Sequence, residues 1–511
     1  TKTKRIQILC LLGAVTLLLS GCWTEAPVES ANGLLGDQEP ADQQEEVILP
    51  AAFTLPYDPD QTLDPVTCAD GMQQVAGSLI YEGLFRLDRQ LEPQPWLCQS
   101  YTYDAASLTY TFTLRSGVTF SDGSPLTAAD AAATLRRAKS SQRYSARLAH
   151  VAAVSAGDGV VIVTLSRPDS SLPALLDIPI VKSGTEESLT PVGTGPYYFT
   201  TDEAGACLAS HSGWWRGESR PAERIALSAA RDREAILYQF SSHEVQLITA
   251  DLIGTEPITA TGNISYEDAD TTVLQFLGFN TARAPFQDSA ARRALGLGIN
   301  RETLVSAVLS GHARAAQFPV SPVSPLYPAE LESLYSYDDF AAAMEAAGLN
   351  TGRTRTVTLL VNQENTFKVS AAEHIAQALS DFDLQIQVEA LPWEEYAAAL
   401  AAGNFDLYYG EVRLPANWDL SALVGTGGSL NYGGWADPQT EQLLAACAAA
   451  EDRAAALSDL CAYLQQQAPI LPLCFKSSSV LYQTGAVSGL TPTAAEPFYD
   501  LPSCQIHLRQ P

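Results

Sequence analysis

Alternating apolar and polar positions predict strands in the N-terminal third of the chain. Tyr110, Phe112 and Leu114 alternate with polar residues, which is the pattern of a strand with one buried face. Glycine-containing turn sequences follow, and Thr127 then stands three residues before Asp130. A Thr-x-x-Asp sequence before an alanine-rich run is typical of a helix capping box, so we expect a helix from about residue 128 to residue 139. Strands are predicted at residues 110–114 and 160–165.

The hydrophobic pattern changes between residues 354 and 411, where short apolar runs alternate with segments whose apolar residues have helical spacing. The predicted order is strand 357–361, helix 367–379, strand 384–388, helix 394–402 and strand 405–410. This alternation predicts a parallel sheet with helices packed on it. Two Ala- and Leu-rich helices follow at 438–450 and 453–467, and then a return strand through residue 475. The pattern indicates an α/β protein with one mixed lobe, one α/β lobe and a C-terminal tail that returns to the first lobe.

The longest apolar run lies at the N-terminus and predicts export. Lys2, Lys4 and Arg5 precede an apolar segment at residues 6–19, and small residues lead from it to Cys22. A cationic start, a short apolar core and small residues at the end describe a secretory signal. The apolar segment is too short for the roughly 30 Å hydrocarbon core that a membrane anchor must cross. We therefore expect residues 1–22 to be a signal peptide.

A polar, acidic stretch comes next. Residues 23–46 contain several Asp and Glu residues, no Lys or Arg, and many Gly, Pro, Ser, Asn and Gln. Such a composition buries too little apolar surface to offset the entropy of ordering, so we expect a disordered tether. The folded part is predicted to begin at Val47.

Charge and chemistry narrow the possible functions. The chain carries 30 basic and 58 acidic residues, a formal net charge of −28, so it repels nucleic acid phosphates and we expect no nucleic acid partner. The six histidines stand at no metal-ligand spacing, which predicts no metal site and no cofactor. No nucleophile elbow or catalytic carboxylate pair stands out, so we expect no enzyme.

The cysteine pattern does not indicate a disulfide scaffold. The nine cysteines include Cys10 and Cys22, which leaves an odd number further along the chain, and no Cys-x-x-Cys occurs. Cys447 and Cys461 lie on the two predicted C-terminal helices. Two interpretations stay open for this pair, a disulfide across the helices and a pair of small core residues.

The end of the apolar N-terminal segment resembles a bacterial lipoprotein cleavage box. Leu19, Ser20 and Gly21 directly precede Cys22. The resemblance implies that the Cys22 thiol receives a diacylglyceryl group and becomes the mature N-terminus. Two acyl chains give stable anchoring to a lipid bilayer. We expect an extracytoplasmic protein that is lipid-anchored to the cell membrane.

Several segments, taken in order, resemble the bacterial extracellular solute-binding proteins of family 5, which serve dipeptide, oligopeptide and nickel ABC importers. Asn300 stands where the family usually has Asp, which keeps a helix N-cap. The matching segments are 62–65, 81–84, 110–115, 120–130, 191–197, 279–295 and 337–348. The resemblance implies an α/β, two-lobed periplasmic-binding-protein-like fold of type II, with an extra N-terminal subdomain and a hinged cleft. The expected limits are lobe I at 47–276 with a subdomain at about 88–190, lobe II at 277–475, and a C-terminal return at 476–511.

The family resemblance implies a membrane-tethered solute-binding lipoprotein of an ABC importer. It would act as a monomer, capture peptides or similar small solutes by hinge closure, and deliver them to the permease subunits. One alternative keeps the fold and changes the solute to a nickel chelate, an oligosaccharide or an opine. A more distant alternative is an exported hydrolase.

The binding site is expected between residues 67–70, which precede a predicted helix at residues 81–84, and residues 411–419, which follow a strand of the predicted parallel sheet. Peptide-binding relatives often have an Asp near position 414 or 415 that pairs with the peptide ammonium, and this chain lacks it. Either Glu411 or Asp419 replaces that acid, or the ligand has no free ammonium. Arg413 either clamps a ligand carboxylate, or is a solvated arginine or a partner for Glu411. Trp393 either stacks on the ligand or packs in the lobe core. The predicted ligand-binding residues are Thr67, Asp70, Trp393, Glu411, Arg413, Trp418 and Asp419.

Overall fold

The computed structural model describes residues 47, 49–68, 71–258 and 262–510. Val47–Pro511 forms one compact unit. The predicted signal peptide, the acidic tether and Cys22 lie outside the described residues. Within the part of the chain that is described, no helix combines the length and the apolar character that crossing a membrane requires.

A four-stranded sheet lies near the start of the described chain. Its strand order is β1-β12-β11-β10, with β1 parallel to β12 and the other neighbours antiparallel. Phe53, Tyr197 and Ile225 belong to the core that this sheet shares with α1 and with the C-terminal segment. The elements are β1 (Thr54–Tyr57), α1 (Gly71–Ser78), β10 (Tyr197–Asp202), β11 (Gly205–Ser210) and β12 (Arg224–Ala229).

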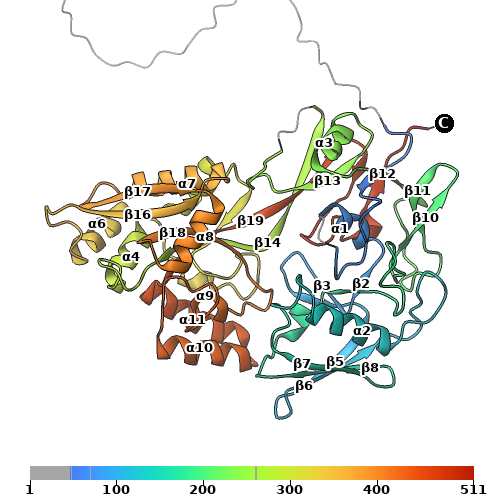
Figure 1. The fold of residues 1–511 in the computed structure, drawn as a ribbon, viewed down its shortest axis with the longest axis horizontal. Helices are drawn as coiled ribbons and strands as arrows, with labels where there is room; N and C mark the ends of the chain where they lie inside the picture. The colour runs from blue at the N-terminus through green and yellow to red at the C-terminus, as the bar shows by residue number, and fades with distance from the viewer. Residues whose placement is uncertain (1–46, 48, 69–70, 259–261, 511) are drawn as a thin grey trace, which may run out of the picture. The chain divides into compact units, whose positions relative to one another are not determined.

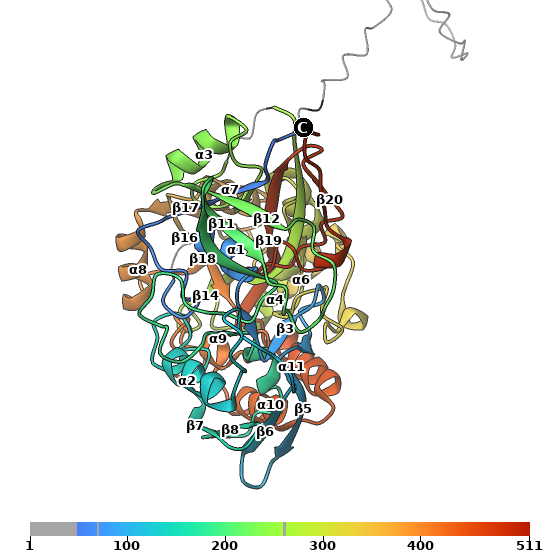
Figure 2. The same cartoon turned by 90° about the vertical axis from the view of Figure 1, so that its right-hand side faces the viewer.

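A second four-stranded antiparallel sheet, in the order β5-β6-β8-β7, carries α2 on its surface (Figure 2). The predicted capping box is confirmed, because the Thr127 side chain accepts from the Asp130 backbone N and the Thr127 backbone N donates to Asp130 Oδ2 at 3.0 Å. The predicted strands at 110–114 and 160–165 are confirmed as well. The elements are β5 (Cys98–Asp104), β6 (Thr109–Leu114), α2 (Ala128–Lys139), β7 (Val151–Ala156) and β8 (Val160–Leu165).

The largest sheet has seven strands in the order β13-β19-β14-β18-β16-β17, with β15 beside β19 (Figure 1). The predicted strand–helix alternation between 354 and 411 is confirmed, and β16 is parallel to both β17 and β18. The strands are β13 (Leu247–Ala250), β14 (Ile264–Phe279), β15 (Ala313–Ala315), β16 (Arg355–Asn362), β17 (Leu384–Leu391), β18 (Leu407–Arg413) and β19 (Ile470–Gln483).

Helices cover this sheet and extend from it. The two predicted C-terminal helices are confirmed as α10 (Pro438–Ala449) and α11 (Arg453–Gln467). Asn300 accepts from the Thr303 backbone N, which confirms its predicted N-cap role. The other helices are α3 (Arg233–Ser241), α4 (Ser289–Leu297), α5 (Arg301–Thr303), α6 (Tyr337–Ala346), α7 (Thr366–Ala378), α8 (Trp393–Ala402) and α9 (Ser421–Val424).

Two long strands, β14 and β19, connect two separate cores. Their ends near Val480 and Leu481 pack with residues of the N-terminal part, whereas Phe276 and Phe475 pack in the C-terminal part. The register of the pair shifts between Asp270 and Leu274, where the strands leave one core and enter the other. The prediction that the return strand ends at 475 was wrong, because its ladder with β14 continues to Gln483.

A second correction concerns residues 81–84, which we expected to form a helix. The helix α1 ends at Ser78, and Glu82–Gly83 forms strand β2, which pairs with β9 (Pro179–Ile180). The carbonyl groups of Leu79 and Ile80 accept instead from the backbone N of Tyr197 at 3.0 Å and of Gly195 at 2.8 Å. A Cβ on Gly195 would lie 2.6 Å from the Ile80 oxygen, so this close approach requires glycine.

The C-terminal segment packs against the first sheet. The Phe498 ring lies 6.2 Å from the Phe53 ring in an edge-to-face arrangement, and Leu501 is buried in the same core. A short pair of strands, β20 (Val487–Ser488) and β21 (Gln505–Ile506), closes this segment. The remaining short strands are β3 (Phe85–Leu87) and β4 (Pro93–Pro95), which pair with each other.

Cys447 and Cys461 are free thiols that lie in the core around α10 and α11. The Cys447 thiol donates to the Ala456 carbonyl oxygen at 3.2 Å. Burial raises the pKa of the Cys447 thiol to about 11. The interpretation as small core residues is confirmed, and no disulfide joins the two helices.

Candidate ligand-binding cavity

A cavity of 1190 Å³ is lined by chain segments that are far apart in the sequence. They come from residues 63–96, 143–177 and 271–272, from residues 412–430, and from residues 493–502 of the C-terminal segment. Thr271 and Thr272, at the register shift of β14, form part of the wall. Volumes of this order suit a small organic molecule or a short peptide.

Arg413 is the predicted site residue that the cavity presents most openly. It ends β18, where its backbone pairs with Val273 of β14, and it lines the cavity. Within the part of the chain that the structure describes, its guanidinium has no hydrogen bond and no ion pair. Burial, followed by the nearby charge of Arg147, lowers the pKa of Arg413. An unpaired guanidinium is a fork-shaped donor for a carboxylate.

Two further arginines make this side of the cavity positive. Arg147 Nη1 pairs with Asp177 Oδ1, and Arg143 Nη1 donates to the Pro65 carbonyl oxygen at 2.9 Å. A carbonyl oxygen satisfies a hydrogen bond of Arg143 but leaves its charge uncompensated. Arg143, Arg147 and Arg413 all line the cavity, and because Arg147 is paired with Asp177, an anionic group placed there gains mainly from Arg143 and Arg413.

Glu411 lies outside the cavity lining and belongs to a separate ion cluster. Its Oε2 lies 3.3 Å from Lys368 Nζ and 3.3 Å from Lys476 Nζ, and it accepts from Gln275 Nε2 at 2.9 Å. Burial raises the pKa of Glu411, but the two ammonium groups and the Gln275 amide together lower it by more, so the net shift is downward. These lysines are therefore the ion-pair partners of Glu411, and Arg413 stays available.

Asp419 lines the cavity but already has partners. Its Oδ2 pairs with Arg167, and its Oδ1 accepts from the Ser421 backbone N at 2.9 Å. Arg167 belongs to the N-terminal part, so this ion pair joins the two sides of the cavity. Both carboxylate oxygens are in use.

The two predicted tryptophans do not line the cavity. Trp418 is 1% exposed and packs edge-to-face on Phe475, with 6.0 Å between the ring centroids. Its indole Nε1 is buried without a hydrogen-bond partner among the described residues. Trp393 is 58% exposed at the start of α8, and its backbone N donates to Glu364 Oε1 at 2.7 Å.

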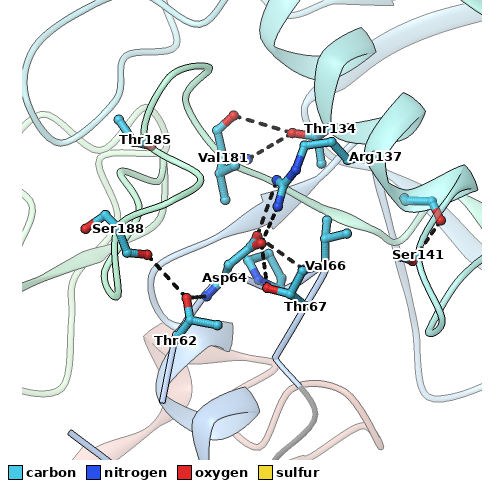
Figure 3. A network of polar contacts seen from close by, with 12 residues as sticks. Thr62, Asp64, Val66, Thr67, Thr134, Arg137, Ser141, Val181, Thr185 and Ser188 are labelled. Atoms are coloured by element: carbon cyan, nitrogen blue, oxygen red, sulfur yellow. Dashed lines mark hydrogen bonds and ion pairs between the residues drawn. The ribbon is translucent and has the colours of Figure 1, made fainter. Parts of the chain in front are cut away.

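Thr67 supports the cavity wall without lining it. Its hydroxyl donates to Asp64 Oδ2 at 2.8 Å, and the guanidinium of Arg137 on α2 binds the same carboxylate (Figure 3). Pro65 and Cys68, on either side of Thr67, do line the cavity. Asp70 lies outside the described residues. Of the predicted residues, the structure thus brings Arg413 and Asp419 to the cavity.

Sequence reasoning missed a polar cluster around Glu82. Three indole groups donate to its carboxylate, and the Thr194 hydroxyl donates at 2.7 Å. The indole donors are Trp96 at 2.9 Å, Trp214 at 3.0 Å and Trp215 at 3.0 Å. Burial raises the pKa of Glu82, and the four donors oppose this shift. The paired tryptophans at 214 and 215 were the available signal in the sequence.

Sequence reasoning also missed Arg86 and Glu496, which form an ion pair on the cavity wall at 3.2 Å. The Arg86 guanidinium lies over the Trp96 ring at 4.1 Å and over the Tyr499 ring at 3.8 Å. Arg86 and Glu496 are more than 400 residues apart in the sequence, so no local pattern could predict that they meet. Arg86 also donates to the Tyr499 carbonyl oxygen of the same C-terminal segment.

No group of three or more His, Cys, Asp or Glu residues that could hold a metal ion occurs among the residues that the structure describes. The chemistry of the cavity therefore rests on arginines, carboxylates and aromatic rings.

The fold agrees with the comparisons to known proteins. The model of the bacterial extracellular solute-binding proteins, family 5 (middle part), matches residues 92–431. The chain belongs to this family, which consists of solute-binding proteins of ABC importers. Its members are two-lobed, extracytoplasmic binding proteins rather than enzymes.

Curated relatives include two proteins named as glutathione-binding. The glutathione-binding protein GsiB of Salmonella paratyphi A is 27% identical over 355 residues, which cover 66% of this chain and 69% of the relative. GsiB of Escherichia coli K12 is 28% identical over 357 residues, with the same coverage.

Solved structures show the same fold. The substrate-binding protein CtaP of Listeria monocytogenes superposes with a TM-score of 0.72 at 17% identity and covers 90% of this chain and 100% of its own. A nickel ABC transporter protein of Bacillus halodurans gives 0.73 at 21% identity, with 87% and 98% covered. The oligopeptide-binding protein AppA of Bacillus subtilis, in complex with a nonapeptide, gives 0.61 at 18% identity, with 90% and 99% covered.

Proposed function

We propose that this protein captures small peptides or peptide-like solutes with a free carboxylate for an ABC importer. The observation that carries the proposal is the unpartnered Arg413 guanidinium on the cavity wall, flanked by Arg143 and Arg147. Arg413 is exposed at the end of β18 and has no partner among the described residues, so its guanidinium is available to donate to a ligand carboxylate. Relatives named as glutathione-binding support a small, anionic peptide as the solute.

Closure of two lobes around the solute fits the way the cavity is built. Strands β14 and β19 cross between the two cores, and their register shift lies at the cavity wall. A local irregularity in a crossing pair of strands is a suitable hinge. The solute must contact both sides to drive closure, because binding shifts an equilibrium only by its differential affinity for the two states.

The test uses the mature, full-length protein and isothermal titration calorimetry. The probes are glutathione and a set of tripeptides, each with a free or an amidated C-terminus. Wild-type protein should bind free-carboxylate probes and lose affinity on amidation. Arg413→Ala should cost about 2–4 kcal/mol of binding free energy, since a desolvated carboxylate loses its partner. Arg353→Ala, an exposed arginine away from the cavity, is the control and should change nothing.

Two outcomes would contradict the proposal. One is binding that is equally strong for free and amidated probes. The other is an unbiased mass-spectrometric screen that recovers only a nickel chelate, an oligosaccharide or an opine, which would favour the alternative solutes. Trp393, Trp418, Thr67, Asp70 and Glu411 also stay predictions as ligand contacts, and their alanine variants belong in the same titration.

We further propose that Cys22 carries a diacylglyceryl anchor and that a monomer delivers the solute to the permease. The box ending at Cys22 and the acidic stretch at 23–46 support this. Cys22→Ser should move the protein from the membrane fraction to the soluble fraction, as measured by immunoblotting. Retention in the membrane without acylation would indicate an uncleaved anchor instead. The lobe limits at 47–276, 277–475 and 476–511 also stay predictions.

A further inference from the structure

We propose that Glu496, on the C-terminal segment, binds the ammonium group of the solute, so that the cavity recognises both charged ends of a zwitterion. This inference rests on the proposed function, since it assigns the second end of the same ligand. It also accounts for the missing acid near position 414, because the ammonium partner would come from the opposite side of the cavity.

The C-terminal segment holds Glu496 firmly at the cavity wall. The Glu496 backbone N donates to Thr493 Oγ1 at 3.2 Å, and the Thr493 backbone N donates to the Glu496 carbonyl oxygen at 3.1 Å. Phe498 and Leu501 anchor the following residues in the core of the first sheet. Thr493–Glu496 and 498–502 together line the cavity. The Glu496 carboxylate is therefore positioned before any ligand arrives.

Glu496 has one open oxygen. Its Oε2 lies 3.2 Å from Arg86 Nη2, and Oε1 has no partner among the described residues. Arg86 cannot shift to satisfy both oxygens, because two aromatic rings enclose its guanidinium and the Tyr499 carbonyl oxygen accepts from it. The Glu496 side chain is 29% exposed, so the open oxygen is reachable from the cavity.

Three other acids of the cavity wall have their carboxylates in use. Asp169 and Asp419 each use both oxygens, and Glu82 accepts from four neutral donors. Asp177 and Glu218 each have one arginine partner, as Glu496 does, and Asp177 is only 15% exposed. The ion pair of Glu496 is longer than those of Asp177 and Glu218, so Glu496 is the least tightly paired of these three acids.

The local charge balance also favours a cation at this place. Glu82 and Asp177 lie near enough to raise the pKa of Glu496, in addition to the larger effect of burial. A ligand ammonium at the open oxygen of Glu496 would favour the ionised carboxylate and would gain a charge-assisted hydrogen bond.

Glu496 and Arg413 would act from different sides of the cavity. Glu496 belongs to the C-terminal segment, which packs on the first sheet through Phe498 and Leu501. Arg413 ends a strand of the seven-stranded sheet. A zwitterion held at both ends therefore contacts both lobes, which is the condition for a solute that drives closure. A solute with only one of the two charges would form an ionic contact with only one lobe and would therefore drive closure less strongly.

The test uses full-length mature protein and a defined peptide pool. The pool is an enzymatic casein digest of two to five residues, used free, N-acetylated or C-amidated, and binding is measured by affinity selection with mass spectrometry and by calorimetry on selected peptides. Wild-type protein should bind free peptides at least tenfold more tightly than N-acetylated ones. Glu496→Gln should bind both forms about equally and keep its sensitivity to C-amidation, which also shows that the cavity is folded. Asp500→Asn, an exposed acid of the same segment, is the control.

The outcomes separate this inference from the proposed function. If wild-type protein loses affinity on amidation but not on acetylation, the proposed function holds and the role of Glu496 is overturned. A full preference for free amines in Glu496→Gln also overturns it. If wild-type protein binds none of the three pools, the proposed function fails and this inference fails with it.

Discussion

Arg413 and Glu496 are charged side chains on the cavity wall, and each has an incomplete set of partners among the described residues. Desolvation lowers the pKa of Arg413 and raises that of Glu496, so in both cases it disfavours the charged form. Such groups are expected where a ligand completes the partner set. Arg292, which is 1% exposed, shows the contrast, since it donates to several backbone carbonyl oxygens and needs no ligand.

Glu496 should also make stability depend on pH. Burial raises its pKa to about 7, with Arg86 opposing the shift and Glu82 and Asp177 adding to it. Between about pH 4.5 and pH 7 the folded protein holds a proton that the unfolded chain releases, so this contribution to stability falls as pH rises through that window. The melting temperature of Glu496→Gln minus that of the wild type should therefore increase from pH 5 to pH 8.

Differential scanning calorimetry at both pH values checks this expectation. Asp500→Asn, which alters an exposed acid of the same segment, should follow the wild type at pH 5 and at pH 8. Parallel melting temperatures of wild type and Glu496→Gln across the window would show that Glu496 titrates normally.

At the scale of residues, the sequence named two side chains that line the cavity, Arg413 and Asp419, and did not find Glu496. Arg413 was named because it follows a strand of the parallel sheet, where ligands collect, and it does line the cavity. Glu411 is two residues earlier on β18, but its partners Lys368 and Lys476 come from α7 and β19. Glu496 owes its place to the return of the C-terminal segment. Contacts over such separations follow from tertiary packing, which local patterns do not encode.

Secondary-structure elements were predicted best where a local signal acts alone. The capping box at Thr127 and the strand–helix alternation before Glu411 depend on neighbours in sequence, and both are confirmed. Two errors came from long-range pairing. Glu82–Gly83 forms β2 because it pairs with β9, and the loop at 193–197 bonds to the carbonyl groups of the two residues before Tyr81. The strand β19 extends to Gln483 because β14 supplies a ladder. Propensity is a weak guide where tertiary hydrogen bonds compete.

The C-terminal end of α10 is capped by a residue from the N-terminal part of the chain. The last carbonyl groups of a helix have no partner within the helix. At the end of α10, the Ser170 backbone N donates to the Ala448 oxygen at 2.8 Å, and the Ser170 hydroxyl donates to the Ala450 oxygen at 2.7 Å. A serine from beyond β8 thus caps α10 from outside. This contact ties the two sides of the cavity together at a place away from β14 and β19.

Across the whole folded unit, the two sides of the cavity are joined in two different ways. The strands β14 and β19 provide a covalent connection, and a set of polar contacts, which we call the closing contacts, joins residues 167–170 to residues 417–450. They comprise the Arg167–Asp419 ion pair, the bond from Asn417 to Asp169 at 3.1 Å, and the two bonds of Ser170. A protein that opens at the strands must break these contacts and keep the strands.

Weakening the closing contacts should therefore lower affinity for every solute by a similar factor. Ser170→Ala removes the hydrogen bond from the Ser170 hydroxyl to the Ala450 oxygen. Ser170 does not line the cavity, so the substitution leaves the lining residues unchanged. Such a bond contributes about 0.5–1.5 kcal/mol, which corresponds to about two- to tenfold weaker binding. Because the solute must then supply more of the closing free energy, free, acetylated and amidated peptides should weaken together. Arg413→Ala and Glu496→Gln would instead change the ratios between these probes.

Calorimetry with the three peptide forms measures those ratios, and small-angle X-ray scattering of the unliganded protein measures the degree of opening. Ser100→Ala, an exposed serine on β5 of the same part of the chain, is the matched control and should leave both unchanged. If Ser170→Ala altered only the preference among the three forms, Ser170 would act on the ligand and not on closure. If it altered neither affinity nor scattering, the ion pair and the crossing strands would suffice to hold the closed state.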